Sequence, residues 1–360
     1  MMRRRIWPAA LLWFSLLSIG MNVLSGSALA FDRSVFDNLD YGIYWYGDQL
    51  VTQKAVSGVA NPYYANAQPT LIYIHGWQNG KTPLLYRETF ARAVDGGPTT
   101  DLTGSWKLNG WNMGIFYWNQ FSDEGDVNDA EAKIWTASGA KQMRWRKADG
   151  SYVNSGITSS AAQLFLDSYK SAMAGYTGND VRLAGHSLGS EMVVVGAKLI
   201  SDAVDRGEIP ANLRPRRVVL LDPAFIGGQR AYLGNRQTVE VGGDYIDAMK
   251  AKGIIFESIN TSGASSGSVA VMNRTAYREL KAWYFSAFDV VGKHMAAVWH
   301  YLWEYQYTAA NIVGTSTRAS SASTSNSATQ SLMNATQRQI HDQGAWTKSP
   351  SDDTYKWTNK

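Results

Sequence analysis

The chain has 360 residues, with 34 Lys and Arg against 30 Asp and Glu, which gives a formal net charge of +4 at pH 7. Three arginines lie within the first five positions, so the rest of the chain is close to neutral, which argues against nucleic-acid binding. There is no cysteine, which excludes a thiol nucleophile, cysteine-ligated metals and disulfide bonds.

The N-terminus has the pattern of a secretory signal peptide. Residues 3–5 are arginines, residues 6–19 are mostly apolar, and residues 28–30 (Ala-Leu-Ala) form a small-residue cleavage site. We expect residues 1–30 to be removed after Ala30, and the protein to be secreted or periplasmic. An uncleaved anchor is the alternative, but the apolar run is short for one. No other run reaches membrane-spanning length, so no transmembrane segment is expected in the mature chain.

From about residue 69 to residue 260, short apolar runs alternate with longer helix-like runs. This alternation is typical of an α/β fold with a parallel sheet. Aromatic alternation in residues 31–68 could provide edge strands. The predicted strands are residues 70–74, 111–118, 180–184, 217–221 and 253–259, and the predicted helices are residues 83–94, 160–174 and 191–204.

The pentapeptide Gly185-His186-Ser187-Leu188-Gly189 is a candidate nucleophile elbow. A strand is predicted before it and a helix after it, which is the context in which a Gly-x-Ser-x-Gly motif exposes its serine above a sheet. We expect Gly185 and Gly189 to allow the sharp turn. Ser187 is therefore the predicted nucleophile.

A serine hydroxyl needs a base to take its proton and an acid to orient that base. Among the histidines, His294 and His300 follow Ser187 in the order that α/β-hydrolases require. His294 opens a predicted helix, from where its imidazole could reach the serine, whereas His300 lies inside that helix and could simply be packed there. We predict His294 as the base and keep His300 as the alternative. The other histidines follow the first strand, sit inside the elbow or lie near the C-terminus: His75, His186 and His341.

Asp222 directly follows the predicted strand 217–221, so its carboxylate is expected at the carboxyl edge of the sheet, where active sites gather. An Asp-Pro pair also favours a turn, and both roles are compatible. We predict Asp222 as the acid. Its competitors lie inside a strand or in expected surface segments: Glu257, Asp244, Asp247 and Asp289.

Attack on an acyl carbon places negative charge on its oxygen, which two backbone N–H groups usually stabilise. Leu188 follows the nucleophile and is the first predicted donor. Trp77, in the turn His75-Gly76-Trp77 after the first strand, is the second.

Four segments resemble the pancreatic-lipase-like family of α/β-hydrolases, in the same order. They are residues 71–77, 112–118, 185–189 and 221–224, and residues 253–262 are similar to that family's strand before its lid. The resemblance implies the α/β-hydrolase fold, with a mostly parallel central sheet and helices on both faces. It also assigns the nucleophile to Ser187, the acid to Asp222 and the oxyanion donors to Trp77 and Leu188.

The sequence departs from that family in three respects. Lys293 and Met295 flank His294, where the family commonly has Asn or Ser and then a polar stretch. The lid disulfides have no counterpart, and no C-terminal lipid-binding sandwich is evident.

We expect a catalytic domain over residues 31–314. Within it, residues 261–293 resemble a lid by position, starting Gly- and Ser-rich and then turning amphipathic; an ordinary packed cap is the alternative. Ser and Thr dominate residues 315–331, which we predict to be a flexible segment. Residues 332–360 would be a C-terminal extension.

The expected protein is a secreted serine hydrolase that cleaves carboxylic esters of lipids, of the lipase or phospholipase A1 type. Its partners would be a lipid or other ester substrate and, transiently, a lipid surface. No cofactor is expected, although scattered aspartates leave a structural Ca²⁺ open. The alternatives are an esterase, polyester depolymerase or peptidase on the same scaffold, or a non-catalytic binding protein, which would lack a triad member.

Overall fold

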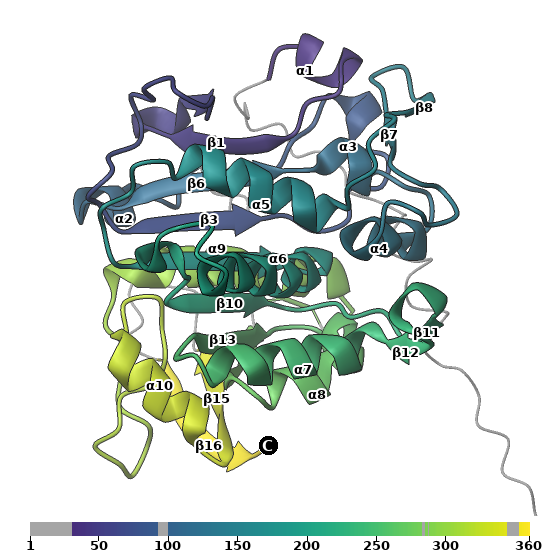
Figure 1. The fold of residues 1–360 in the computed structure, drawn as a ribbon. Coiled ribbons are helices and arrows are strands. Elements are labelled where there is room, and N and C mark those ends of the chain that lie inside the picture. Colours follow the sequence, from purple (N-terminus) through teal and green to yellow (C-terminus); the bar gives the residue numbers. More distant parts are fainter. Residues whose placement is uncertain (1–30, 93–99, 283–284, 287, 344–352) are drawn as a thin grey trace, which may run out of the picture.

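The computed structural model describes residues 31–92, 100–282, 285–286, 288–343 and 353–360, so the expected signal peptide lies outside the described residues. A 10-stranded sheet runs through the centre of the molecule (Figure 1). Across the sheet the order is β16 (Thr354–Asn359), β15 (Gln337–Gln343), β14 (Ala276–Ala282), β13 (Ile255–Asn260), β10 (Arg217–Leu221), β9 (Val181–His186), β3 (Thr70–Ile74), β6 (Asn112–Tyr117), β1 (Gly42–Tyr46) and β2 (Thr52–Lys54).

Neighbouring strands from β6 to β15 all pair in parallel. The strands β1, β2 and β16 run antiparallel to their neighbours at the two sides. This is the mostly parallel sheet that the sequence predicts, and it brings the carboxyl ends of β3, β9, β10, β13 and β14 to one edge.

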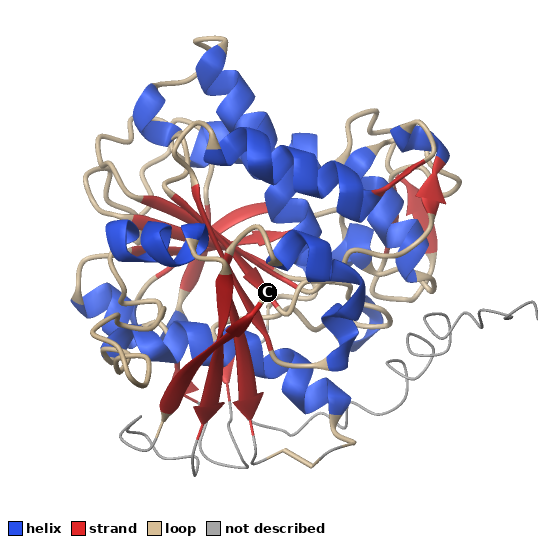
Figure 2. Ribbon diagram, turned by 90° about the horizontal axis from the view of Figure 1, so that it is seen from below, coloured by secondary structure: helices blue, strands red, loops and turns tan. Residues whose placement is uncertain are grey.

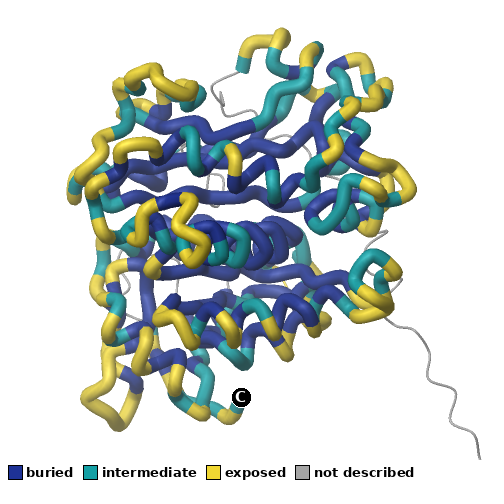
Figure 3. The backbone as a smooth tube through the Cα atoms, viewed as in Figure 1, coloured by how far each residue is buried: buried dark blue, intermediate teal, exposed yellow. Residues whose placement is uncertain are grey.

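Helices cover both faces of the sheet (Figure 2). Successive strand residues point to opposite faces: Ile72 and Ile74 pack into one core cluster, and Leu71 and Tyr73 into the other. The strands are therefore buried over most of their length, as Figure 3 shows. One face carries α4 (Val127–Trp135), α5 (Ala161–Ala172), α6 (Leu188–Asp205), α7 (Thr238–Lys250), α8 (Val269–Met272) and α10 (Asn326–Asn334), and the other carries α2 (Gly104–Leu108) and α9 (Val290–Trp303).

Shorter helices, strand pairs and 3₁₀ turns lie around the central sheet and its covering helices. Within the described residues, no helix has the length and apolarity to cross a membrane. The short elements are α1 (Ser34–Asp37), α3 (Asn119–Ser122), the pairs β4 (Ala91–Arg92) with β5 (Thr100–Asp101), β7 (Arg144–Arg146) with β8 (Tyr152–Asn154) and β11 (Gln229–Arg230) with β12 (Arg236–Gln237), and the 3₁₀ turns η2 (Asp48–Leu50), η3 (Thr82–Leu84), η4 (Ala211–Leu213), η5 (Ala231–Leu233), η6 (Gly263–Ser268) and η7 (Glu304–Gln306).

The helix predicted over residues 83–94 is wrong for its described part. Pro83 lies within the short 3₁₀ turn η3, and Leu85 then adopts a left-handed conformation with φ of 51° that ends it. Residues 93 and 94 lie outside the described residues. The other predicted helices and the predicted strands are confirmed to within a few residues at each end.

The insertion expected over residues 261–293 is not a continuous lid. Its central part is β14, which pairs with β13 on one side and β15 on the other. Tyr277 and Leu280, whose apolar side chains suggested an amphipathic segment, are buried in this strand. Both faces of β14 are covered, so its apolar pattern reflects burial within the sheet.

The Ser/Thr-rich segment is packed against the domain and is not a flexible linker. Ser320, Ser321 and Thr324 are buried, and the segment continues into α10. Two buried arginines donate to its carbonyls: Arg182 Nη1 to Ala322 O at 2.8 Å and Arg217 Nη2 to Thr324 O at 2.5 Å. These charged donors satisfy a polar segment that has few apolar side chains of its own.

The described residues of the predicted extension, 332–343 and 353–360, are also not an appendage, because β15 and β16 extend the central sheet. Leu332 and Met333 of α10 belong to the main core cluster. The boundary predicted at residue 314 therefore falls inside one continuous sheet and core.

Candidate active site

Ser187 stands at the turn between β9 and α6. Its φ of 56° and ψ of −125° are unusual for a residue with a side chain, which is the strained geometry of a nucleophile elbow. The surrounding backbone fixes it: the Ser187 N–H donates to Leu221 O at 3.0 Å, and its carbonyl accepts from Ala224 N at 3.1 Å. The turn is therefore tied to the end of the next strand, β10.

The elbow glycines provide space. A Cβ on Gly185 would lie 2.1 Å from Gly189 O, and one on Gly189 would lie 2.3 Å from Ile74 O. Neither glycine has a positive φ; Ser187 itself carries the unusual conformation. The glycines therefore allow the sharp turn by leaving space: Gly185 lets the start of α6 fold back against β9, and Gly189 lets it lie against the end of β3.

His294 and Asp222 form a close, buried pair. His294 Nδ1 and Asp222 Oδ2 are 2.5 Å apart, with both side chains almost completely shielded from solvent. Asp222 emerges directly after β10, as predicted, and has φ of 42°. His294 lies in the second turn of α9, which follows β14. A carboxylate bonded to Nδ1 leaves Nε2 as the nitrogen that can accept a proton.

Four further donors hold the Asp222 carboxylate, and the sequence analysis did not identify them. Thr261 N and Ser262 N donate to Oδ1 at 2.7 and 3.0 Å, Ser265 Oγ donates to Oδ1 at 3.2 Å, and Ser262 Oγ donates to Oδ2 at 2.5 Å. Burial alone would raise the pKa of Asp222, but the bonds from His294, Ser262 and Thr261 outweigh it and lower that pKa. The sequence signal that could have identified these donors is the polar pair Thr261-Ser262 directly after β13. Because β13 ends beside β10, this pair lies next to Asp222.

His300 belongs to a different cluster. Its Nδ1 lies 3.7 Å from Glu304 Oε1, one helical turn further along. The Glu304 carboxylate in turn accepts hydrogen bonds from Arg278 Nη1 and Nη2, at 2.9 and 2.7 Å. Burial lowers the pKa of His300. His300 does not line the cavity that holds Ser187 and His294.

The competing acids all have other partners. Glu257 lies 3.3 Å from Arg217, and Asp289 caps the N-terminus of α9 by accepting from Gly292 N at 2.7 Å. The remaining two form surface ion pairs, Asp244 with Arg236 and Asp247 with Arg274.

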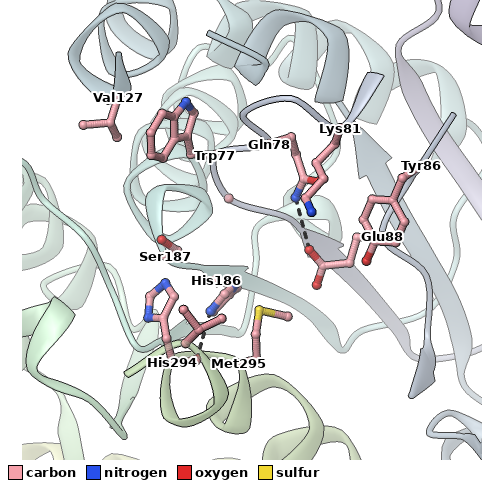
Figure 4. A pocket seen from close by; sticks show the side chains of 12 residues that line it. Trp77, Gln78, Lys81, Tyr86, Glu88, Val127, His186, Ser187, His294 and Met295 are labelled. Carbon is pink, nitrogen blue, oxygen red and sulfur yellow. Dashed lines mark hydrogen bonds between the residues drawn. The ribbon is translucent and has the colours of Figure 1, made fainter. Parts of the chain in front are cut away.

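Ser187, His186 and His294 line a common cavity of about 90 Å³. Figure 4 shows the His294 imidazole beside the Ser187 hydroxyl, with Trp77 above the serine. Among the described residues, no hydrogen bond joins the Ser187 hydroxyl to the His294 imidazole. In sites without substrate, the contact between nucleophile and base is often long or misaligned. The rest of the lining is mixed, apolar at Trp77, Tyr86, Val127, Val291 and Met295 and polar at Gln78, Lys81 and Glu88.

His186, inside the elbow, forms part of this cavity wall. Its Nε2 lies 3.0 Å from His294 O, and the two rings are 4.5 Å apart. Burial, followed by repulsion from His294, lowers the pKa of His186 to about 3. A carbonyl oxygen can only accept, so in this contact neutral His186 carries its proton on Nε2. His186 thereby fixes the backbone of His294.

The two predicted oxyanion donors lie on adjoining segments. Leu188 is the first residue of α6, and a Cβ on Gly76 would lie 3.4 Å from its N atom. Trp77 follows Gly76 directly, and its indole is fixed by a 2.8 Å bond from Nε1 to Glu124 O. Within the described residues, neither the Trp77 nor the Leu188 backbone N–H donates a hydrogen bond.

A metal site is not apparent in the part of the chain that the structure describes. No group of three or more His, Asp and Glu side chains there is arranged to hold an ion.

No protein-family model and no curated protein matches this chain. Solved structures do match it, at low identity. A lipase-esterase related protein from Clostridium acetobutylicum is 12% identical with a TM-score of 0.32, over 72% of this chain and 94% of that one. An esterase from the archaeon Pyrobaculum calidifontis is 14% identical with a TM-score of 0.27, over 60% and 66%.

The protein TT1662 from Thermus thermophilus is also 14% identical with a TM-score of 0.27, over 54% of this chain and 66% of that one. TM-scores of this size do not place the chain in a family. The pancreatic-lipase-like family stays a resemblance of motifs.

Proposed function

We propose that this chain is a serine hydrolase that cleaves carboxylic esters through Ser187, His294 and Asp222. The observation that carries the proposal is the buried 2.5 Å contact between Asp222 and His294 in the wall of the cavity that exposes the strained Ser187. A binding protein on this fold would have no need of the oriented pair.

In the proposed reaction, Ser187 Oγ attacks the ester carbonyl carbon and its proton passes to His294 Nε2. The charge that develops on the carbonyl oxygen is stabilised by the N–H groups of Trp77 and Leu188. The C–O bond then breaks, the alcohol leaves with the proton from His294, and the acyl group stays on Ser187. Water, deprotonated by His294, attacks this acyl-enzyme and releases the acid. Asp222 keeps the imidazole oriented and stabilises its charged form.

We propose lipid esters as the substrates, of the lipase or phospholipase A1 type. Two apolar side chains next to cavity-lining residues support this: Leu84 is 60% exposed and lies between Lys81 and Tyr86, and Phe288 is 93% exposed and precedes Val291. Turnover of p-nitrophenyl esters of increasing acyl length, below and above the aggregation threshold, tests the proposal. A preference for short, monomeric esters would point instead to a general esterase.

The hydrolase assignment is tested with a fluorophosphonate probe, which labels activated serines covalently. We expect labelling of the wild-type protein and none of Ser187→Ala. Ser201→Ala is a matched control, because Ser201 is buried on the same helix and its hydroxyl has no hydrogen-bond partner. An unlabelled wild-type protein would favour a binding protein, and hydrolysis by Ser187→Ala would contradict the assigned nucleophile.

We also propose that the protein is exported, since residues 3–30 carry the three parts of a signal peptide. N-terminal sequencing of the protein recovered from its native compartment should begin at Phe31. A chain that retains residues 1–30 would contradict cleavage.

A further inference from the structure

Two carboxyl groups outside the triad meet in the interior. Glu131 lies on α4 and Glu191 on α6, one turn after Ser187, and both are fully buried. Their carboxyl groups are close enough that each shifts the pKa of the other. Two ionised carboxylates repel at such a distance, so this proximity requires a proton between them.

The hydrogen-bond donors around the pair indicate where that proton lies. Glu131 Oε1 accepts from Ile226 N at 3.1 Å and from Thr238 Oγ1 at 3.1 Å, and its Oε2 accepts from Arg230 Nε at 2.6 Å. Glu191 Oε1 accepts from the Trp135 indole, but its Oε2 has no partner.

A buried carboxylate oxygen without a donor is costly. A proton on Glu191 Oε2, donated to Glu131, removes both the missing bond and the repulsion.

Few other charged groups face this pair. In the described structure they are Arg230, from the β11 segment, and the Tyr232 hydroxyl, 3.4 Å from Glu131 Oε2. One guanidinium neutralises one carboxylate, so the second carboxyl group is best kept neutral. In agreement, burial and then the charge of Glu131 raise the pKa of Glu191 well above its ordinary value.

The pair connects the proposed nucleophile to the loop of the proposed acid. That loop starts at Asp222; Ala224 N donates to Ser187 O, and Ile226 N donates to Glu131. Figure 1 shows α4 and the β11–β12 pair at the same end of the molecule. Glu191 lies on α6, the helix that starts directly after Ser187, so its proximity to Glu131 links this helix to the loop.

We propose that Glu131 and Glu191 share one proton and together position the Asp222 loop against helix α6, Glu131 as the acceptor for the loop and Glu191 as the protonated partner. The positioning of the triad rests on the proposed function; the shared proton does not.

The proposal predicts a loss of stability at alkaline pH. The folded chain holds the Glu191 proton more tightly than the unfolded chain does, so this contribution to stability declines as pH rises from the ordinary carboxyl range through the raised pKa. Deprotonation would place a second negative charge beside Glu131 and loosen the loop.

Two isosteric variants of the full chain test this. In Glu191→Gln the amide nitrogen donates to Glu131 as the protonated acid would, so we expect Tm at pH 7 within about 2 °C of wild type, kcat within about two-fold, and a flatter fall of Tm and kcat toward pH 10. In Glu131→Gln the amide cannot accept all three hydrogen bonds from Ile226, Arg230 and Thr238. We therefore expect Tm lower by about 5 °C or more at pH 7, or no stable fold, and kcat reduced about ten-fold or more.

Glu208→Gln, at an exposed surface site, controls for the charge change and should behave as wild type. A Glu191→Gln protein that keeps the wild-type alkaline decline, or loses as much Tm at pH 7 as Glu131→Gln, overturns the shared proton. The Tm series needs no catalysis, so it distinguishes failure of this proposal from failure of the hydrolase assignment. If Tm follows the expectation in a catalytically active protein but the pH profile of kcat is the same in Glu191→Gln and wild type, the positioning role is overturned.

Discussion

At the scale of single residues, the site depends on one oxygen atom, Asp222 Oδ2. It is 2.5 Å from His294 Nδ1 and also 2.5 Å from Ser262 Oγ. The serine hydroxyl and the two backbone N–H groups on Oδ1 leave the carboxylate little freedom to rotate. The orientation of His294 is therefore set by a loop that follows the neighbouring strand, β13.

Removing the Ser262 hydroxyl should disturb this orientation without touching the substrate. For Ser262→Ala we expect kcat to fall about ten-fold with little change in KM, since a hydrogen bond to a charged group contributes about 1.5–3 kcal/mol. Asp222→Asn should be more severe, with a loss of about 10⁴-fold in kcat. Steady-state kinetics on one soluble ester measures both. Equal kcat in Ser262→Ala and wild type would show that the backbone donors and the Ser265 hydroxyl are enough to orient the acid.

The same variant changes acid stability. The lowered pKa of folded Asp222 stabilises the protein above its unfolded value of about 3.9, and this contribution disappears as pH falls through the folded pKa. With one stabilising bond removed, Ser262→Ala should lose Tm at a higher pH than wild type. Thermal unfolding between about pH 2 and pH 5 measures the shift. Parallel curves would contradict the role of Ser262 in lowering the pKa of Asp222.

At the scale of elements, the close approach of the β3 loop to the start of α6 determines the proposed oxyanion hole. A Cβ on Gly76 would lie 2.8 Å from Ser187 Cβ and 2.9 Å from His186 O. For Gly76→Ala we expect Trp77 N to move away from Leu188 N and kcat to fall about 10²-fold or more, as when one oxyanion donor is removed.

Gly125→Ala is the matched control, because no atom lies within 4 Å of the added Cβ and its φ is not positive. Fluorophosphonate labelling rates and circular dichroism separate a displaced donor from a misfolded chain. Labelling of Gly76→Ala at the wild-type rate would contradict the assigned geometry.

The elements also show what the sequence could predict. The elbow and the β3 turn were predicted to the residue, because a Gly-x-Ser-x-Gly motif between a strand and a helix is defined by neighbours in the sequence. The proposed acid and the proposed base were inferred from chain order and from the end of β10, and the structure brings their side chains into contact. The hydrogen bonds from Ser262 to Asp222 and the strand β14 were missed. Both depend on which strands lie beside β10 and β13, and short apolar runs do not encode the order of strands in a sheet.

Residues 315–331 are packed in a defined conformation for a similar reason: their partners are distant in the sequence. It depends on bonds from Arg182 and Arg217, more than 100 positions away in the chain. Composition alone predicted flexibility, since it counts only the apolar surface that a segment can bury by itself.

At the scale of the whole molecule, the C-terminal strands are part of the same sheet that carries the proposed active site. β15 pairs with β14, the strand that leads into the helix of His294, and α10 packs Leu332 and Met333 into the core beside β13 and β14. Arg278 of β14 is buried and lies 3.3 Å from His341 Nδ1 on β15. Removing residues 315–360 would therefore expose core side chains, leave Arg182 and Arg217 without their carbonyl partners, and make β14 an open edge.

We expect a chain that ends at residue 314 to be insoluble or to lack a cooperative unfolding transition, since breaking one buried charged contact already costs about 3–5 kcal/mol against a total stability of about 5–15 kcal/mol. Calorimetry and fluorophosphonate labelling of the truncated and full chains, expressed alike, provide the comparison. The point substitution Arg217→Met isolates one contribution: it should lower Tm while leaving a labelled, folded protein if α10 and the sheet still pack. A soluble, cooperatively unfolding and labelled fragment of residues 31–314 would mean that the C-terminal strands dock on an already complete domain, and that the helix of His294 does not need β15 beside β14.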